Sequence, residues 1–190
     1  MFGFVPVPVF AYEQTEPAEG ATEVWEPYVF PTLTADTGQE YIDAVEAKLV
    51  ADGHILKRYP GQMPYRGRFI VPQGEETTYT IELDSTQPTL QQLNTLVHEW
   101  AHALHWELDR DTLGMSRGKV AEFVAEASSY VVLAELGYDT TPKSVSYIAM
   151  QHIAEEDEKR ERMMLKLITD IVAVIIDRLA MAPATANRQL

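Results

Sequence analysis

The most informative stretch of this sequence is Thr95-Leu96-Val97-His98-Glu99-Trp100-Ala101-His102, which predicts a helix that carries a metal site. His98 and His102 are four residues apart, so on a helix they share one face and lie about one turn from each other. Two imidazoles at this spacing can reach one metal ion, and Glu99 leans off the ligand face toward the position of a bound water. The H-E-x-x-H pattern therefore predicts two metal ligands and a general base within one helical turn.

A second helical segment, expected from about residue 116 to 136, places Glu122 and Glu126 on one face. Its opposite side is apolar, so the segment should pack against the H-E-x-x-H helix. Antiparallel packing would bring one glutamate to the metal, where a third protein ligand is expected. We predict Glu122 as this ligand and Glu126 as a supporting residue that hydrogen-bonds a ligand histidine. The reverse assignment stays open, because both side chains point along the same face.

The ligand types favour zinc, which binds imidazole and carboxylate groups readily. The chain has no cysteine. This excludes disulfides, thiolate zinc sites and thiol catalysis.

The periodicity of the remaining chain predicts an α+β fold. A helix is expected from Thr37, as its N-cap, to Ala51, followed by strands at 54–59, 68–71 and 77–83 that form a small antiparallel sheet. The H-E-x-x-H helix should span about 88–108. A third helix of this bundle begins at Pro142 and continues, with or without a break near Ala154, into a long C-terminal helix that ends at Leu179. The expected organisation is a Pro- and aromatic-rich arm (1–36), a zincin-like domain (37–181) and a tail (182–190).

The charge and hydropathy of this chain of 190 residues exclude some classes of binding partner. A net charge of −14 argues against nucleic acid and anionic membranes as partners. The N-terminus lacks the basic start of a signal peptide, and the apolar run 171–176 is too short to span a bilayer. A soluble cytoplasmic protein is expected. The aromatic arm and the Met- and Ile-rich C-terminal helix are candidate surfaces for a partner or for self-association.

The two metal-helix motifs together resemble the gluzincin zinc metallopeptidases. More narrowly, the stretches from Thr95 to His105, from Glu122 to Val132 and from Glu135 to Tyr138, with Tyr147-Ile148, resemble the peptidase domain of ArdC-like antirestriction proteins and their ImmA/IrrE relatives. The similarity covers about residues 56–179. It implies zinc, a small sheet with helices, and hydrolysis of peptide bonds in a protein substrate or a regulatory variant of it. The resemblance implies a phage or mobile-element protein, and a phage-encoded one could be virion-associated. The DNA-binding segment of ArdC-like proteins is not apparent here.

The implied chemistry assigns further residues. Glu99 would accept the proton of a zinc-bound water, whose pKa zinc lowers to about 7. A second donor to the oxyanion is expected, with Tyr147 as the first candidate and Tyr130 as the second. His105 is interpreted as a supporting or surface residue, because a fourth histidine ligand would displace the water.

Two further expectations complete the prediction. An exposed sheet edge, at 77–83, could hold an extended substrate by strand addition. The alternative function is a zinc-stabilised interaction or antirestriction-like regulatory module that acts by binding host or virion proteins, without significant proteolysis.

Overall fold

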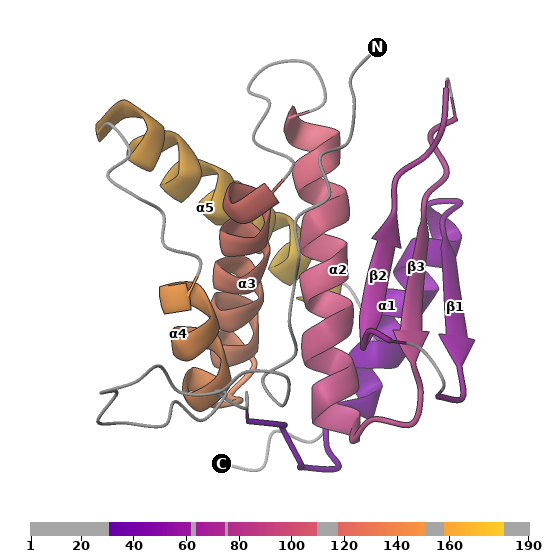
Figure 1. The fold of residues 1–190 in the computed structure, drawn as a ribbon. Helices are drawn as coiled ribbons and strands as arrows, with labels where there is room; N and C mark the ends of the chain where they lie inside the picture. Colours follow the sequence, from indigo (N-terminus) through magenta and orange to yellow (C-terminus); the bar gives the residue numbers. More distant parts are fainter. Residues whose placement is uncertain (1–30, 62–63, 75, 110–117, 151–157, 181–190) are drawn as a thin grey trace, which may run out of the picture. The chain divides into compact units, whose positions relative to one another are not determined.

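The computed structural model describes residues 31–61, 64–74, 76–109, 118–150 and 158–180, and shows an α+β fold (Figure 1). In chain order the elements are α1 (Gln39–Ala51), β1 (Ile55–Tyr59), β2 (Gly67–Ile70), β3 (Thr80–Asp84), α2 (Thr89–Asp109), α3 (Gly118–Glu135), α4 (Thr141–Met150) and α5 (Glu158–Ala180). The predicted α+β class, three strands and long C-terminal helix are therefore confirmed. The tail at 182–190 and the first thirty residues of the arm lie outside the described part of the chain.

The sheet is mixed, and the predicted antiparallel sheet is wrong in this respect. The strand order is β1-β3-β2, with β3 parallel to β1 and antiparallel to β2. Tyr59 at the end of β1 and Gly67 at the start of β2 pair with Asp84 and Leu83, on opposite sides of the same end of β3. β2 therefore lies on the far side of β3 from β1. Because β1 and β2 run in opposite directions, β3 between them is parallel to one and antiparallel to the other.

β3 is the central strand, so the expectation that it forms an exposed edge is wrong. Residues 81–84 are all buried, because β3 is paired on both sides and covered on both faces. Tyr79, Ile81 and Leu83 face the helices as the alternation predicts. On the other face Glu82 is buried beneath Tyr59, Tyr65 and Arg68, which all donate hydrogen bonds to it. The edges of the sheet are β1 and β2.

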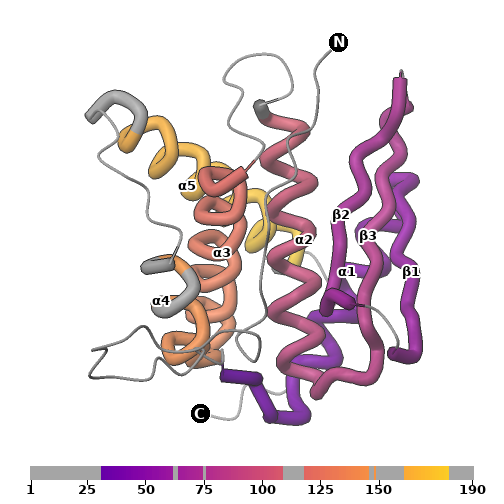
Figure 2. Tube along the Cα trace, in the orientation of Figure 1, coloured from indigo at the N-terminus to yellow at the C-terminus, as the bar shows by residue number. Residues whose placement is uncertain are grey.

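α2 lies between the sheet and the helices α3, α4 and α5 (Figure 2). It contacts β2 and β3 on one side, α3 and α5 on the other, and α1 as well. Nearly every residue from Leu90 to His105 is buried as a result; His98, Glu99 and His102 are the partly exposed ones. The polar motif on this helix is therefore surrounded by core.

Two local features differ from the sequence expectation or extend it. The N-cap of α1 is Gly38, in a left-handed conformation with φ 96°, and no side chain caps the helix, so the predicted cap at Thr37 is wrong. A Cβ at Gly38 would lie 2.8 Å from Leu93 Cδ2, so close packing on α2 selects glycine here. The described end of the arm is ordered against α2: Leu33 is buried and its N–H donates to Gln91.

Candidate metal centre

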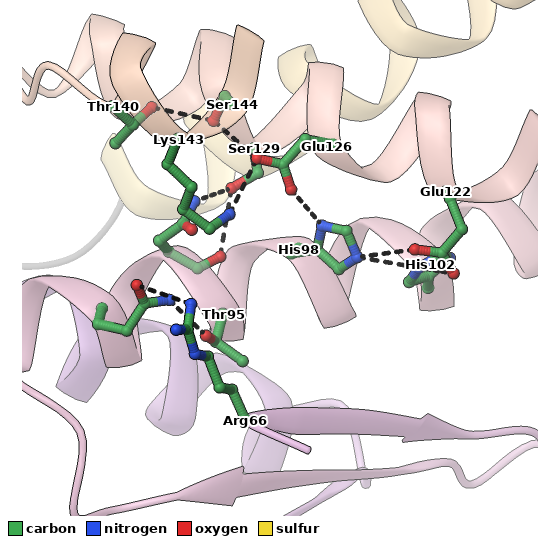
Figure 3. Close-up of polar contacts among 12 residues, drawn as sticks. Arg66, Thr95, His98, His102, Glu122, Glu126, Ser129, Thr140, Lys143 and Ser144 are labelled. Atoms are coloured by element: carbon green, nitrogen blue, oxygen red, sulfur yellow. Dashed lines mark hydrogen bonds and ion pairs between the residues drawn. The ribbon is translucent and has the colours of Figure 1, made fainter. Parts of the chain in front are cut away.

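Three polar pairs between α2 and α3 show how these helices are aligned. Asn94 Nδ2 donates to Ser129 Oγ, His98 contacts Glu126, and His102 contacts Glu122. Residue numbers rise on α2 as they fall on α3, so the two helices are antiparallel neighbours, as the sequence predicted. The antiparallel alignment brings the H-E-x-x-H turn opposite residues 122–126 of α3 (Figure 3).

The side chains of His98, His102 and Glu122 converge on one point and could hold a metal ion. The two Nε2 atoms are 3.2 Å apart, and the Glu122 carboxylate lies 3.6 Å from His98 Nε2 and 3.4 Å from His102 Nε2. Zinc bonds of about 2.0–2.1 Å at tetrahedral angles would separate ligand atoms by about 3.3–3.4 Å. The separation of the two Nε2 atoms is close to that value, and the Glu122 carboxylate approaches His98 with Oε2 and His102 with Oε1, so the group has about the size of a zinc site. Glu122 is 39% exposed, so this corner of the site is open to solvent.

The ring of His98 is oriented by Glu126. The distance from His98 Nδ1 to Glu126 Oε2 is 3.0 Å, and Glu126 is 1% exposed. When Nδ1–H donates to this carboxylate, Nε2 carries the lone pair that a metal requires. Glu122 and Glu126 thus occupy different positions in the geometry: Glu122 meets both Nε2 atoms, whereas Glu126 meets the opposite nitrogen of His98.

Charges around the histidines shift the pKa values of the site in opposite directions. Burial lowers the pKa of His98, but hydrogen bonds to Glu122 and Glu126 outweigh burial and raise it to about 9. Hydrogen bonds from His102 and His98 hold the pKa of Glu122 well below its usual range. Burial raises the pKa of Glu126, yet His98 and Lys143 outweigh it, and the net effect lowers the pKa to about 2. The metal-free site therefore holds a proton on His98, between two carboxylates.

Two residues of α4 complete the surroundings of Glu126. Ser144 Oγ donates to Glu126 Oε1 at 2.7 Å, and Lys143 Nζ lies 3.0 Å from the same oxygen (Figure 3). Ser144 is fully buried, and a weaker contact of 3.4 Å joins its hydroxyl to Thr140. Oε1 of Glu126 is thus bound by α4 and Oε2 by His98.

Glu99 is held by the edge strand of the sheet. Its Oε2 accepts a hydrogen bond of 2.8 Å from the backbone N–H of Phe69 in β2. β2 can approach this closely because residue 67 is glycine: a Cβ there would lie 2.5 Å from Thr95 Cγ2 and 3.1 Å from Glu99 Cγ. The proposed base is therefore fixed between α2 and β2.

The structure does not bring every predicted residue to this centre. His105 is buried at 1% exposure, so the surface interpretation is wrong. Tyr130 lies about 12 Å along α3 from Glu122 at 1.5 Å per residue, and its hydroxyl contacts Thr141 Oγ1 at 3.2 Å. It is therefore not placed to act on a group at the histidines. Tyr147 belongs to α4, but its side chain lies outside the described part of the structure.

The sequence analysis missed Gly67, Lys143 and Ser144. A glycine between two arginines indicates only a turn or the end of a strand. The close approach of Gly67 to Thr95 and Glu99 depends on α2, about thirty residues further along the chain. Lys143 and Ser144 follow Pro142 at the start of α4, where a polar pair is unremarkable. The available signal was the need of a buried Glu126 for more than one partner, because a buried carboxylate requires compensating charge and hydrogen bonds.

A comparison of the chain with models of protein families, with curated proteins and with solved structures found no match. The resemblance to gluzincins and ArdC-like proteins therefore remains a prediction from the motifs. Among the helices that the structure describes, none combines the length and apolar character needed to cross a membrane.

Proposed function

We propose that this protein is a zinc-dependent metallopeptidase of the gluzincin type that hydrolyses peptide bonds of a protein substrate. One observation carries the proposal: His98 Nε2, His102 Nε2 and the Glu122 carboxylate lie 3.2–3.6 Å from one another. Three protein ligands with an open fourth position are typical of catalytic zinc, whereas structural zinc sites are closed by four.

Zinc is the metal that this donor set suits best. Two imidazoles and one carboxylate form a borderline-soft, three-ligand set, and a chain without cysteine offers no thiolate. Hard cations such as calcium prefer six to eight oxygen ligands, and the group formed by the described residues supplies nitrogen atoms from His98 and His102.

The residues of this chain have distinct roles in the proposed reaction. A bound zinc ion would supply a Lewis acid that polarises a carbonyl group and acidifies water. Glu99 serves as general base, and the Phe69 N–H fixes one of its oxygens while the other accepts the proton. Glu126 keeps the ring of His98 in the tautomer that leaves Nε2 available.

The edge of β2 is the surface best suited to an extended peptide. Asp84 N–H donates to Arg66 O, and residues 66 and 68 pair with β3, so the backbone groups of Gly67 and Phe69 point away from it. This edge runs beside Glu99, which accepts the Phe69 N–H, so a substrate strand would pair with the Gly67 N–H and with the Gly67 and Phe69 carbonyl groups. A substrate strand added there would lie next to the base. The proposed strand addition thus moves from the predicted 77–83 segment to β2.

The test uses purified protein, a mixed peptide library read by mass spectrometry, and elemental analysis. We expect about one zinc per chain, and a 10²- to 10⁴-fold loss of cleavage in Glu99→Gln with zinc retained. Glu107→Gln is the matched control, because it makes the same change on the same helix two turns away. Full activity in Glu99→Gln, or cleavage that persists after zinc removal, would refute the peptidase proposal.

A second candidate is a zinc-stabilised regulatory module that acts by binding. The hydrogen bond from Phe69 to Glu99 favours it, since a carboxylate that bonds the backbone can serve to join α2 to β2. This candidate predicts that binding to its target survives Glu99→Gln while no peptide in the library is cut.

A further inference from the structure

We propose that α4 acts as a clamp on the metal centre: its docking on α3 and metal binding at His98 are coupled through Glu126. The inference rests on the proposed metal site but not on peptidase activity. It assigns positioning roles to Lys143 and Ser144, neither of which contributes an atom to the ligand group.

The carboxylate of Glu126 is divided between two partners. Oε2 faces His98 Nδ1 at 3.0 Å, and Oε1 receives Ser144 Oγ at 2.7 Å and Lys143 Nζ at 3.0 Å. With 1% exposure, Glu126 has no room to exchange these partners for solvent. Because a carboxylate is planar and rigid, fixing one oxygen fixes the other. The α4 donors therefore set the orientation of the oxygen that holds the His98 ring.

The contacts of Lys143 and Ser144 with Glu126 also help to hold α4 on α3. Among the described elements, α4 packs against α3 and no other. Tyr130 and Thr141 make a further polar contact between these two helices, at 3.2 Å. Val145 on the same helix is half exposed. The Glu126 contacts tie the first turn of α4 to α3 through a buried carboxylate.

Docking of α4 and metal binding at His98 must therefore influence each other equally. If docked α4 orients His98 for a metal, then a bound metal, by fixing His98 and Glu126, must stabilise docked α4 by the same factor. Any partner that displaces α4 would weaken metal binding to the same degree. The clamp is therefore a route by which the centre can be regulated from outside the ligand set.

Ser144→Ala is the cleanest perturbation. It deletes one hydroxyl and changes no charge. Lys143→Met would be ambiguous, because removing a positive charge near the site favours every cation and opposes the loss of orientation. Val145→Ala is the matched control on the same helix, since Val145 is exposed and does not contact Glu126.

The experiment measures zinc affinity by chelator competition, the visible spectrum of the cobalt-substituted protein, and hydrogen exchange of peptides from residues 139–150. Partners of ligand histidines typically contribute 10- to 100-fold to metal affinity, and Ser144 acts one bond further out. We expect Ser144→Ala to weaken zinc binding about three- to tenfold with the cobalt spectrum unchanged, and Val145→Ala to have no effect. Zinc should slow exchange in α4 of the wild type, by the factor with which docked α4 favours zinc binding.

Unchanged zinc affinity in Ser144→Ala, or α4 exchange that is the same with and without zinc, would overturn the clamp. If Ser144→Ala does not fold, the exchange measurement on the wild-type protein still decides. A wild type that binds zinc, protects α4 and cuts no peptide would support the clamp and refute the peptidase. A wild type that cuts peptides without protecting α4 would refute the clamp alone.

Discussion

The metal-free centre should make the stability of this protein depend on pH in a diagnostic way. His98 has a folded pKa of about 9 against an ordinary value of 6.5, so the folded state binds its proton more tightly. Its stabilising effect is complete below pH 6.5 and is lost as the pH rises through 9. Glu126 has a folded pKa of about 2 against 4.5, so its effect is present above pH 4.5 and is lost as the pH falls toward 2. The metal-free protein should therefore be most stable between about pH 4.5 and 6.5.

The loss of stability at alkaline pH can be estimated from the pKa shift of His98. A shift from 6.5 to about 9 is about 2.5 pKa units, and at 1.36 kcal/mol per unit it is worth about 3 kcal/mol. The same contacts are counted again in the shift of Glu126, so the two values are not added. The acid limb is less specific, because Glu82 and Asp84 also have lowered pKa values and lose stability in the same range. We assign the loss of stability between about pH 6.5 and 9 to deprotonation of His98.

The assay is urea unfolding with a chelator present, at pH 6 and at pH 9.5. We expect the free energy of unfolding to fall by about 3 kcal/mol between these values in the wild type, and the fall to be much smaller in Glu126→Gln. His54→Gln is the control: burial lowers the pKa of His54, so its contribution has the opposite sign and the fall should remain. A wild type equally stable at both pH values would refute the proposed protonation of His98.

Three further outcomes are expected. Zinc at about 100 times its Kd should raise Tm by about 5–10 °C, measured by calorimetry with and without chelator; an unchanged Tm would contradict a metal site in the folded state. Gly67→Ala should destabilise the protein by about 1–3 kcal/mol, because the new Cβ meets Thr95 and Glu99. Adding Thr95→Ser, which removes the Cγ2 at 2.5 Å, should recover part of that loss in urea unfolding; no recovery would show that another contact is limiting. Glu82→Gln should lower the free energy of unfolding by about 1–3 kcal/mol, since Arg68 loses its buried partner; stability equal to wild type would rule out that contribution.

The helical part of the fold was largely predictable because helical periodicity is local. Apolar positions at 3.6-residue spacing placed α2 and α3 within a few residues of their observed bounds, and placed the end of the C-terminal helix at Leu179, one residue before the observed end. The same periodicity placed His98, His102 and the two glutamates on the facing sides of two helices. Their convergence required one assumption only, that consecutive helices pack antiparallel.

The sheet was less predictable because strand order is a long-range property. Alternation identified the buried face of Tyr79, Ile81 and Leu83, but the strand order β1-β3-β2 puts β3 in the centre, parallel to β1. The alternating sequence of β3 carries no sign of a central strand, because its second face is covered by Tyr59, Tyr65 and Arg68 bonded to Glu82. The N-cap of α1 was missed for a similar reason, because contact with Leu93 selects Gly38.

The sequence by itself determined that His98, Glu99 and His102 occupy one helical turn and that a glutamate pair can face them. Spacing on a helix is set by backbone geometry, which needs no partner. The tertiary structure decided that Glu122 meets both Nε2 atoms, that Glu126 meets Nδ1, and that β2 and α4 hold Glu99 and Glu126 in place. Those outcomes depend on distances of a few tenths of an ångström between elements far apart in the chain, and packing of the whole core sets such distances.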